Sequence, residues 1–219
     1  RALERQPLAG MAAAKMLFPD HRINSTGICI SMSGAAWDRG MFEPDVGQYD
    51  EERDVFGPCA GAAMYRREML DEIGLFDEDF FLYMEDVDLA FRGRLAGWSC
   101  IYVPEAVVYH FHGGTAGFQS DLTVYYGNRN ILWYPVKNFP FFLLIASLPW
   151  IIGRNLSVIA YYALRNQGRI ILKSKIDGLR GLPKMVKKRS GIKRDVPIKE
   201  IQKFLRAEGS KMRGLNVDH

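Results

Sequence analysis

The sequence predicts an α/β fold in which short apolar strands alternate with helices. Of the 219 residues, 48% are hydrophobic and 25% are charged, as in a globular domain. Over residues 59–111, two helical patterns are followed by two apolar, strand-like runs. The composition excludes a disordered chain, a collagen and a disulfide-rich scaffold. The sequence shows no repeat of about 20 to 50 residues, which argues against a solenoid.

The expected elements follow in chain order. Residues 26–31 (TGICIS) alternate as a short strand does, and an acidic, glycine-containing loop follows over residues 38–54. Residues 66–73 form a helix that Gly74 ends as a C-cap. A second helix begins near residue 85 or 86 and ends before Gly97. The runs WSCIYV and AVVYHF are expected as two short strands split by Pro104, because proline cannot donate within a ladder.

A long apolar segment comes next. Residues 139–152 are apolar throughout, but a membrane-spanning helix needs about 20 such residues. Arg154 and Asn155 are expected to interrupt the segment before hydrophobicity continues to Leu164. Aromatic residues near the breaks and basic residues beyond them favour an interfacial or re-entrant segment over a span. The alternative is an ordinary buried pair of core helices.

Charge is distributed unevenly along the chain. Residues 1–164 carry a net charge of −7 and residues 165–219 carry +11, which together give the formal +4. A basic tail of this kind predicts an anionic partner, either lipid headgroups or nucleic acid, and a solvated helical face is the alternative. Glycine and proline punctuate the tail, so we expect short amphipathic pieces lying on the surface. Little aromatic interleaving and the preceding apolar segment make lipid the better partner and disfavour nucleic acid.

The cysteines and the first residues of the chain indicate the cellular compartment. Cys29, Cys59 and Cys100 are scattered without CxxC spacing, which indicates reduced, buried thiols in a cytosolic protein. The chain opens RALERQPLAG, without an apolar signal core, so nothing marks it for secretion. A further segment upstream of Arg1 is compatible with this start.

Carboxylates crowd the start of the second helix. Glu85, Asp86 and Asp88 follow an aromatic run, and the helix macrodipole explains one or two acidic residues in a first turn. Partial desolvation by the aromatic side chains would raise their pKa values towards those of a general base. For the upstream cluster at residues 77–79, a turn or cap is the preferred interpretation.

Other candidates carry weaker signals. His110 and His112 would point to one face of a strand, and either a metal site or a hydrogen-bonded core histidine fits them. Arginine guanidinium groups bind diphosphate oxygens well, and a solvated helix surface is the alternative for each basic side chain. The candidates are Arg66 with Arg67, and Arg129 with Lys137.

The order of these motifs is more specific than any one of them. The series runs from CAGAA at residues 59–63 through RR, GLFDE and FFLYMEDVDL at residues 80–89 to YVP and VYH, which ends at His110. Over residues 26–140 it resembles the family 2 glycosyltransferases, and within them the bacterial rhamnosyltransferase-like members of the GT-A fold. The resemblance implies inverting transfer of a sugar from a nucleotide-diphosphate donor to an acceptor hydroxyl.

The resemblance also implies residue roles. Asp86 matches the catalytic base of the Glu-Asp motif, and Glu85 is the residue beside it. Asp88 matches a further acidic position, either structural or acceptor-facing. His110 falls where some relatives place a ligand of a divalent ion, Mg²⁺ or Mn²⁺. The expected substrate-binding residues are Cys59, Ala60, Gly61, Arg67, Asp88 and Arg129.

Family members begin with a Rossmann-like, nucleotide-binding half that ends in an Asp-x-Asp metal motif, and this sequence shows no such half. We therefore expect a partial GT-A domain at residues 1–138, a membrane-interface segment at 139–164 and a basic amphipathic tail at 165–219. The isolated chain is expected to be inactive, because the donor-binding half is absent, and part of the metal site would lie in that half.

The functional expectation is a glycosyltransferase of cell-surface polysaccharide or lipid-linked oligosaccharide synthesis. Its partners would be a nucleotide-sugar donor, a glycan or lipid-linked acceptor and an anionic membrane surface. It would lie on the cytoplasmic face of the cell membrane as a peripheral or monotopic protein. The alternative is a non-catalytic, membrane-associated interaction module derived from such an enzyme.

Overall fold

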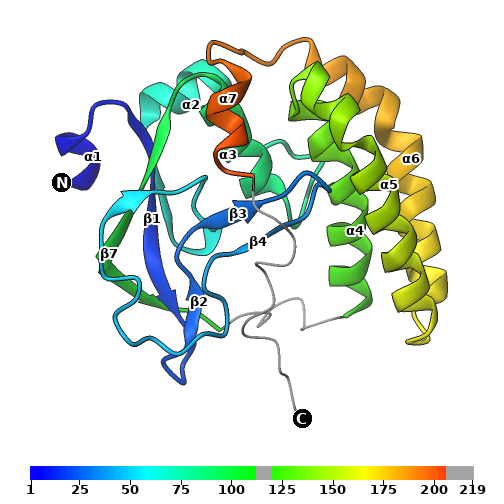
Figure 1. The fold of residues 1–219 in the computed structure, drawn as a ribbon, viewed down its shortest axis with the longest axis horizontal. Coiled ribbons are helices and arrows are strands. Elements are labelled where there is room, and N and C mark those ends of the chain that lie inside the picture. Colours follow the sequence, from blue (N-terminus) through cyan, green and yellow to red (C-terminus); the bar gives the residue numbers. More distant parts are fainter. Residues whose placement is uncertain (112–119, 206–219) are drawn as a thin grey trace.

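The computed structural model of the protein describes residues 1–111 and 120–205. A mixed sheet lies on one side of the molecule and three long helices lie on the other, so the predicted α/β class is confirmed (Figure 1). The strands are β1 (Ala9–Leu17), β2 (Ile23–Ser25), β3 (Ile28–Ile30), β4 (Ala36–Asp38), β5 (Arg53–Asp54), β6 (Ala63–Tyr65) and β7 (Ser99–Tyr109). The helices are α1 (Ala2–Arg5), α2 (Arg67–Ile73), α3 (Glu85–Leu95), α4 (Asp121–Asn138), α5 (Phe141–Ala163), α6 (Gly168–Arg189) and α7 (Ile198–Gln202), with a 3₁₀ turn at Ala60–Ala62.

Strand β1 organises the main sheet. It pairs in parallel with β7 and antiparallel with β2 and β6, while β5 pairs with the other side of β7. The strand expected at residues 26–31 is β3, which forms a separate ribbon with β4. The prediction of two strands split by Pro104 is wrong, because β7 runs through this residue. Its pairing jumps from Ala14–Val103 to Lys15–Val107, so the proline lies in a bulge where no ladder bond is required.

The two predicted helices are confirmed as α2 and α3. Gly74 ends α2 with a φ of 81° and donates its N–H to the carbonyl of Leu70 at 2.9 Å. Gly97 lies just past α3 with a φ of 95°. Helix α3 is buried along its length, and Phe91 packs at its centre against Phe56 and Phe139, with ring centroids 5.4 and 5.3 Å apart. This packing places α3 between the sheet and the long helices (Figure 1).

Helix α5 is one continuous helix of 23 residues, so the interruption expected at Arg154 and Asn155 is absent. The Asn155 side chain donates to the carbonyl of Ile151 at 2.7 Å, which keeps its polar group within the helix. Only 11% of the apolar window of α5 is buried, which disfavours the core-helix alternative. Its mean hydropathy is 1.6, and by length and composition alone it is long and apolar enough to cross a membrane.

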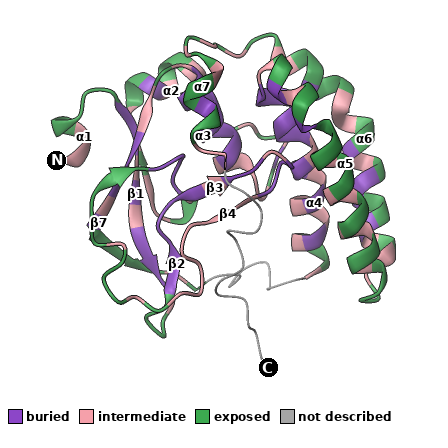
Figure 2. Cartoon of the chain, viewed as in Figure 1, coloured by how far each residue is buried: buried purple, intermediate pink, exposed green. Residues whose placement is uncertain are grey.

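The basic tail also differs from the expectation of short surface pieces. Helix α6 runs unbroken for 22 residues and packs along α4, with Ile171 and Met185 buried between them. The outer surfaces of α5 and α6 are mostly exposed (Figure 2). Among the cysteines, which form no disulfide, only Cys100 is fully buried, while Cys29 and Cys59 are partly exposed.

Candidate active site

The Glu-Asp pair opens helix α3 after an unusual turn. Phe81, Tyr83 and Met84 have left-handed backbones with φ values of 59°, 65° and 68°. Met84 is the N-cap residue, and its side chain makes no capping bond. The acidic first turn therefore follows an N-cap residue that supplies no side-chain cap.

Asp86 is half-buried and anchored by backbone amides. Its Oδ2 accepts a hydrogen bond from the N–H of Ala60 at 3.2 Å, and its Oδ1 accepts one from the N–H of Val87 at 2.8 Å. Burial raises the pKa of Asp86, and these two bonds offset only part of that rise. The result is a carboxylate in fixed orientation that accepts a proton more readily than an exposed aspartate.

Two further carboxyl groups share this environment. Burial and the charge of Asp86 raise the pKa of Glu85 to about 7. Asp38, at the end of β4, also has its pKa raised to about 7, by burial and then by Asp86, although hydrogen bonds from Ser25 and Cys59 oppose the rise. The sequence placed Asp38 only at the edge of an acidic loop. Its role depends on the pairing of β3 with β4, which no local pattern indicates.

The segment of Cys59, Ala60 and Gly61, here called the 59–61 segment, forms one wall of the site. Its position follows from close packing, since a Cβ at Gly57 would lie 2.3 Å from the Cβ of Ala90 on α3. Burial, followed by the charges of Asp38 and Asp86, raises the pKa of Cys59, so its thiol stays protonated and donates to Asp38. The 59–61 segment therefore lies beside Asp86 in the structure.

His110 reaches the same segment from the end of β7. Its N–H donates to the carbonyl of Leu17 at 2.8 Å, which prolongs the β1–β7 pairing. Its ring Nδ1 lies 3.3 Å from Oδ1 of Asn24. A Cβ at Gly61 would lie 3.7 Å from the ring Nε2, so His110 and Asp86 both border the 59–61 segment. His112 lies outside the described residues.

The divalent ion that the resemblance implies needs a set of converging ligands. Within residues 1–111 and 120–205, no three His, Cys, Asp or Glu side chains are grouped so as to hold a metal. His110 supplies one imidazole, but a metal centre needs several ligands around the same point. The described residues alone therefore do not fit a divalent ion.

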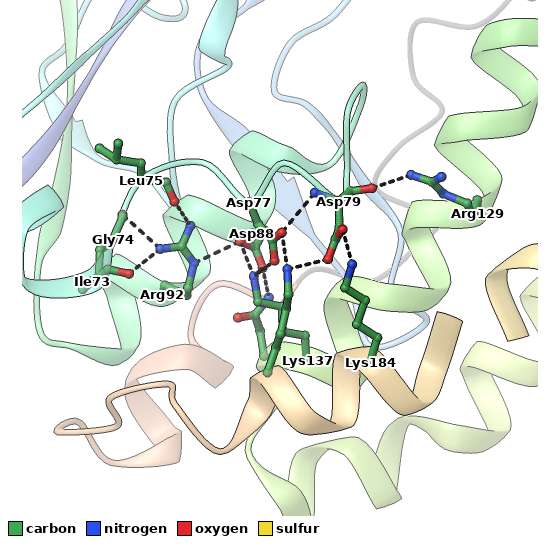
Figure 3. Close-up of polar contacts among 12 residues, drawn as sticks. Ile73, Gly74, Leu75, Asp77, Asp79, Asp88, Arg92, Arg129, Lys137 and Lys184 are labelled. Atoms are coloured by element: carbon green, nitrogen blue, oxygen red, sulfur yellow. Dashed lines mark hydrogen bonds and ion pairs between the residues drawn. The ribbon is translucent and has the colours of Figure 1, made fainter. Parts of the chain in front are cut away.

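Asp88 requires a correction to the expected substrate-binding set. Its side chain is fully buried, and it accepts hydrogen bonds from Arg92 Nε at 2.9 Å, Lys137 Nζ at 2.8 Å and Asn138 Nδ2 at 2.7 Å (Figure 3). An occupied carboxylate without exposed surface cannot contact a substrate, so Asp88 is structural. Lys137, a candidate diphosphate partner, is likewise committed to Asp88 and Asp77 inside the protein.

The arginines do not gather at Asp86. Arg67 is 83% exposed on α2 and pairs with Asp71, as the solvated-surface alternative describes. Arg66 binds backbone carbonyls near the N-terminus, including that of Ala9 at 2.8 Å. Arg129 donates to the carbonyl oxygens of Asp79 and Phe80, so its guanidinium serves the turn before α3.

Two cavities among the described residues lie away from Asp86. One, of about 700 Å³, lies along α5 between Pro149 and Tyr161. The other, of about 300 Å³, is lined by residues near β5 and the start of β7, among them Gln6 and Arg53. Asp86 borders neither.

Comparison with known proteins shows which family and which proteins this sequence is similar to. Residues 42–130 match the model of the glycosyltransferase-like family 2, a stretch that includes the 59–61 segment, Asp86 and His110. Over 66 residues, 30% of this chain, the sequence is 42% identical to an N-acetylglucosaminyl-diphospho-decaprenol L-rhamnosyltransferase of Mycobacterium tuberculosis. Over 112 residues, 48% of this chain, it is 25% identical to an O-antigen biosynthesis protein of Myxococcus xanthus. The matches cover 22% and 9% of the lengths of these relatives.

Proposed function

We propose that the protein transfers a sugar from a nucleotide-diphosphate donor to an acceptor hydroxyl, because residues 42–130 match the glycosyltransferase-like family 2 and 66 residues of the chain are 42% identical to a rhamnosyltransferase. The observation that carries the proposal is Asp86 itself. It occupies the Glu-Asp motif within the matched stretch, its carboxylate is fixed by two amides, and its pKa is raised. The names of the matched relatives favour an acceptor in polysaccharide synthesis, and one of them favours a lipid-linked acceptor.

The proposed step is a displacement with inversion at the anomeric carbon. Asp86 accepts the proton of the acceptor hydroxyl as its oxygen forms the new bond to the sugar. The bond from the anomeric carbon to the diphosphate breaks, and the nucleoside diphosphate leaves with the electron pair. Each oxygen of Asp86 accepts one amide hydrogen bond and keeps a lone pair for the incoming proton.

The neighbouring carboxyl groups share this environment. Burial raises the pKa of Asp86, and the charge of Asp86 adds to the effect of burial on the pKa values of Asp38 and Glu85. A general base is most effective when its pKa lies near the working pH. A Mg²⁺ or Mn²⁺ ion stays a prediction of the resemblance, with His110 as its candidate ligand.

A second part of the proposal is attachment to the cytoplasmic face of an anionic membrane. Exposed apolar side chains along α5 supply a surface for the lipid interface, namely Phe141, Phe142, Ile145, Leu148, Trp150, Ile152 and Leu156. The net charge of +11 over residues 165–219 attracts acidic headgroups. A membrane-bound enzyme of this kind would meet a lipid-linked acceptor at the surface.

The test is a panel of nucleotide sugars offered with polyprenyl-diphosphate-linked and free glycan acceptors. Product mass identifies transfer, and the anomeric configuration of the product determined by NMR tests inversion. Turnover by the protein but not by Asp86→Asn supports the proposal. Vesicle binding with no turnover by either this chain or its upstream-extended form would indicate the non-catalytic membrane module.

The expectation of a separate donor-binding half stays a prediction, and a comparison of two forms of the protein tests it. The 219-residue chain is assayed beside an upstream-extended gene product under the same conditions. Turnover only by the extended form supports that expectation, whereas turnover by the shorter chain alone contradicts it.

A further inference from the structure

The turn that delivers Asp86 is energetically unfavourable by itself. Three bulky, non-glycine residues at positions 81, 83 and 84 have left-handed backbones, each of which costs on the order of 1 kcal/mol. Such a turn persists only where its surroundings hold it. The question is which side chains supply that restraint.

Asn130 of α4 supplies most of it. Its side chain is fully buried, and its Nδ2 donates to three carbonyls of the turn, those of Phe80 at 2.7 Å, Leu82 at 2.8 Å and Tyr83 at 2.8 Å. An amide NH₂ has two hydrogens, so one of them is shared between two acceptors. One side chain thus satisfies three backbone oxygens in the segment that precedes Glu85.

Arg129 completes the restraint from the adjacent position. It donates to the carbonyls of Asp79 at 2.7 Å and Phe80 at 3.1 Å, and its Nε donates to Oδ1 of Asn130 at 2.9 Å (Figure 3 shows the bond to Asp79). The guanidinium carbon lies 4.1 Å from the centre of the Trp133 ring on the same helix, a cation–π contact that helps to hold it in place. The two side chains form one unit that fixes the turn to α4.

We propose that Asn130 is a positioning residue for Asp86, which acts by holding the left-handed turn in place. The inference rests on the proposed function and assigns it a residue that touches neither substrate nor base. The carboxylate of Asp86 meets the N–H of Ala60 only where α3 begins in this register. Misplacement of a reacting group by about 1 Å can lower a rate by about a hundredfold.

The chain offers a matched control on the same helix. Asn128 is also buried, and its side chain donates to the carbonyl of Val124 at 3.0 Å, with no bond to the turn. Asn130→Ala and Asn128→Ala each remove a buried amide from α4, so both lose stability. Only Asn130→Ala releases the turn.

Hydrogen–deuterium exchange tests the restraint without any substrate. In Asn130→Ala, the amides of residues 80–88 should exchange at least tenfold faster, while those of β1 and β7 keep their protection. Asn128→Ala should leave residues 80–88 unchanged. If Asn130→Ala does not fold, Arg129→Gln replaces it, since this half-buried side chain binds the same turn from outside. Unchanged exchange at residues 80–88 in the folded variant would overturn the proposal.

Kinetics then test the consequence for Asp86. Asn130→Ala should lower kcat by about 10- to 100-fold, with the donor KM changed by less than about threefold, because the base is displaced and the binding groups are not. Asn128→Ala should keep kcat within about twofold. Equal losses of kcat in the two variants would overturn the positioning role. Absence of turnover in both the unaltered protein and its upstream-extended form would instead refute the proposed function, and the exchange result would stand.

Discussion

The carboxyl groups of Asp38, Glu85 and Asp86 share one poorly solvated corner of the molecule. Burial is the largest cause of the raised pKa of each group. Holding such groups together costs folding free energy, and proteins commonly accept that cost at a functional site. The clearest sign of this cost is the buried Oε2 of Glu85, which has no hydrogen-bond partner within the described residues.

This arrangement predicts that Glu85→Gln stabilises the protein at alkaline pH. The pKa of Glu85 is about 7 in the folded chain, against 4.5 when the group is free. Between these values the unfolded chain has lost a proton that the folded chain keeps, so the free energy of unfolding falls as pH rises from about 4.5 to 7. Glutamine removes that loss, and the gain at pH 8 should be on the order of 1–3 kcal/mol.

Urea denaturation at pH 4 and pH 8 measures the effect. At pH 4 the variant and the unaltered protein should agree, since the carboxyl group is protonated in both states. The groups that face Glu85 are Asp86, Tyr65 and Tyr83, and the variant leaves all of them in place. Glu68→Gln, on the exposed surface of α2, is the control. No gain at pH 8 would contradict the burial of this charge.

At the scale of elements, a buried ion cluster joins four parts of the chain. Lys137 of α4 lies between Asp77 of the preceding loop and Asp88 of α3, with Nζ–O distances of 2.7 Å to each. Lys188 of α6 reaches Asp77 as well. Burial alone would raise the pKa of Asp77, but the bonds from Lys137 and Lys188 lower it to about 2. The cluster therefore fastens α6 and α4 to the loop that leads to the site (Figure 3).

Loss of Lys137 should consequently be costly. Lys137→Met leaves two buried carboxylates short of a partner, and the free energy of unfolding should fall by about 3–5 kcal/mol at pH 7. Arg67→Ala, which breaks the exposed pair with Asp71, should change it by less than about 1 kcal/mol. Chemical denaturation of both variants makes the comparison. A Lys137→Met change no larger than that of Arg67→Ala would show that the cluster contributes little.

At the scale of the whole molecule, we expect the outer surfaces of α5 and α6 to set its orientation on a membrane. Helices α5 and α6 lie side by side away from the sheet (Figure 1), and α5 carries exposed apolar side chains. Lipid binding should have an apolar and an electrostatic part. Sedimentation with anionic vesicles should weaken as salt rises, because headgroup attraction is screened, yet some binding should persist in about 1 M salt.

Substitutions on α5 test the apolar contribution to lipid binding. Phe142 and Trp150 are 80% and 61% exposed on α5, and replacing both by serine should weaken vesicle binding in high salt by about tenfold or more. Leu75→Ser, at a residue that is 70% exposed beside α2, is the control and should bind as before. Complete release of the unaltered protein by salt would remove the role of α5.

The sequence predicted what local patterns determine. The capping glycine after α2, the acidic start of α3 and the spacing of the Glu-Asp motif are local, and the structure bears out the two helices. The bulge at Pro104 and the continuity of α5 through Arg154 depend on tertiary pairing and on bonds within the helix. Asp38 and Asn130 were missed because each reaches the site through contacts with residues far from it in the sequence.

The most direct test of the account is the turnover of Asp86→Asn under conditions where the unaltered protein transfers sugar. The substitution keeps the shape of the side chain and removes its proton affinity. We predict that kcat falls by a factor of about 10² to 10⁴, the range for loss of a general base, while nucleotide-sugar binding measured by calorimetry stays within about threefold. Turnover within about tenfold of the unaltered protein would contradict the assignment of Asp86 as the base.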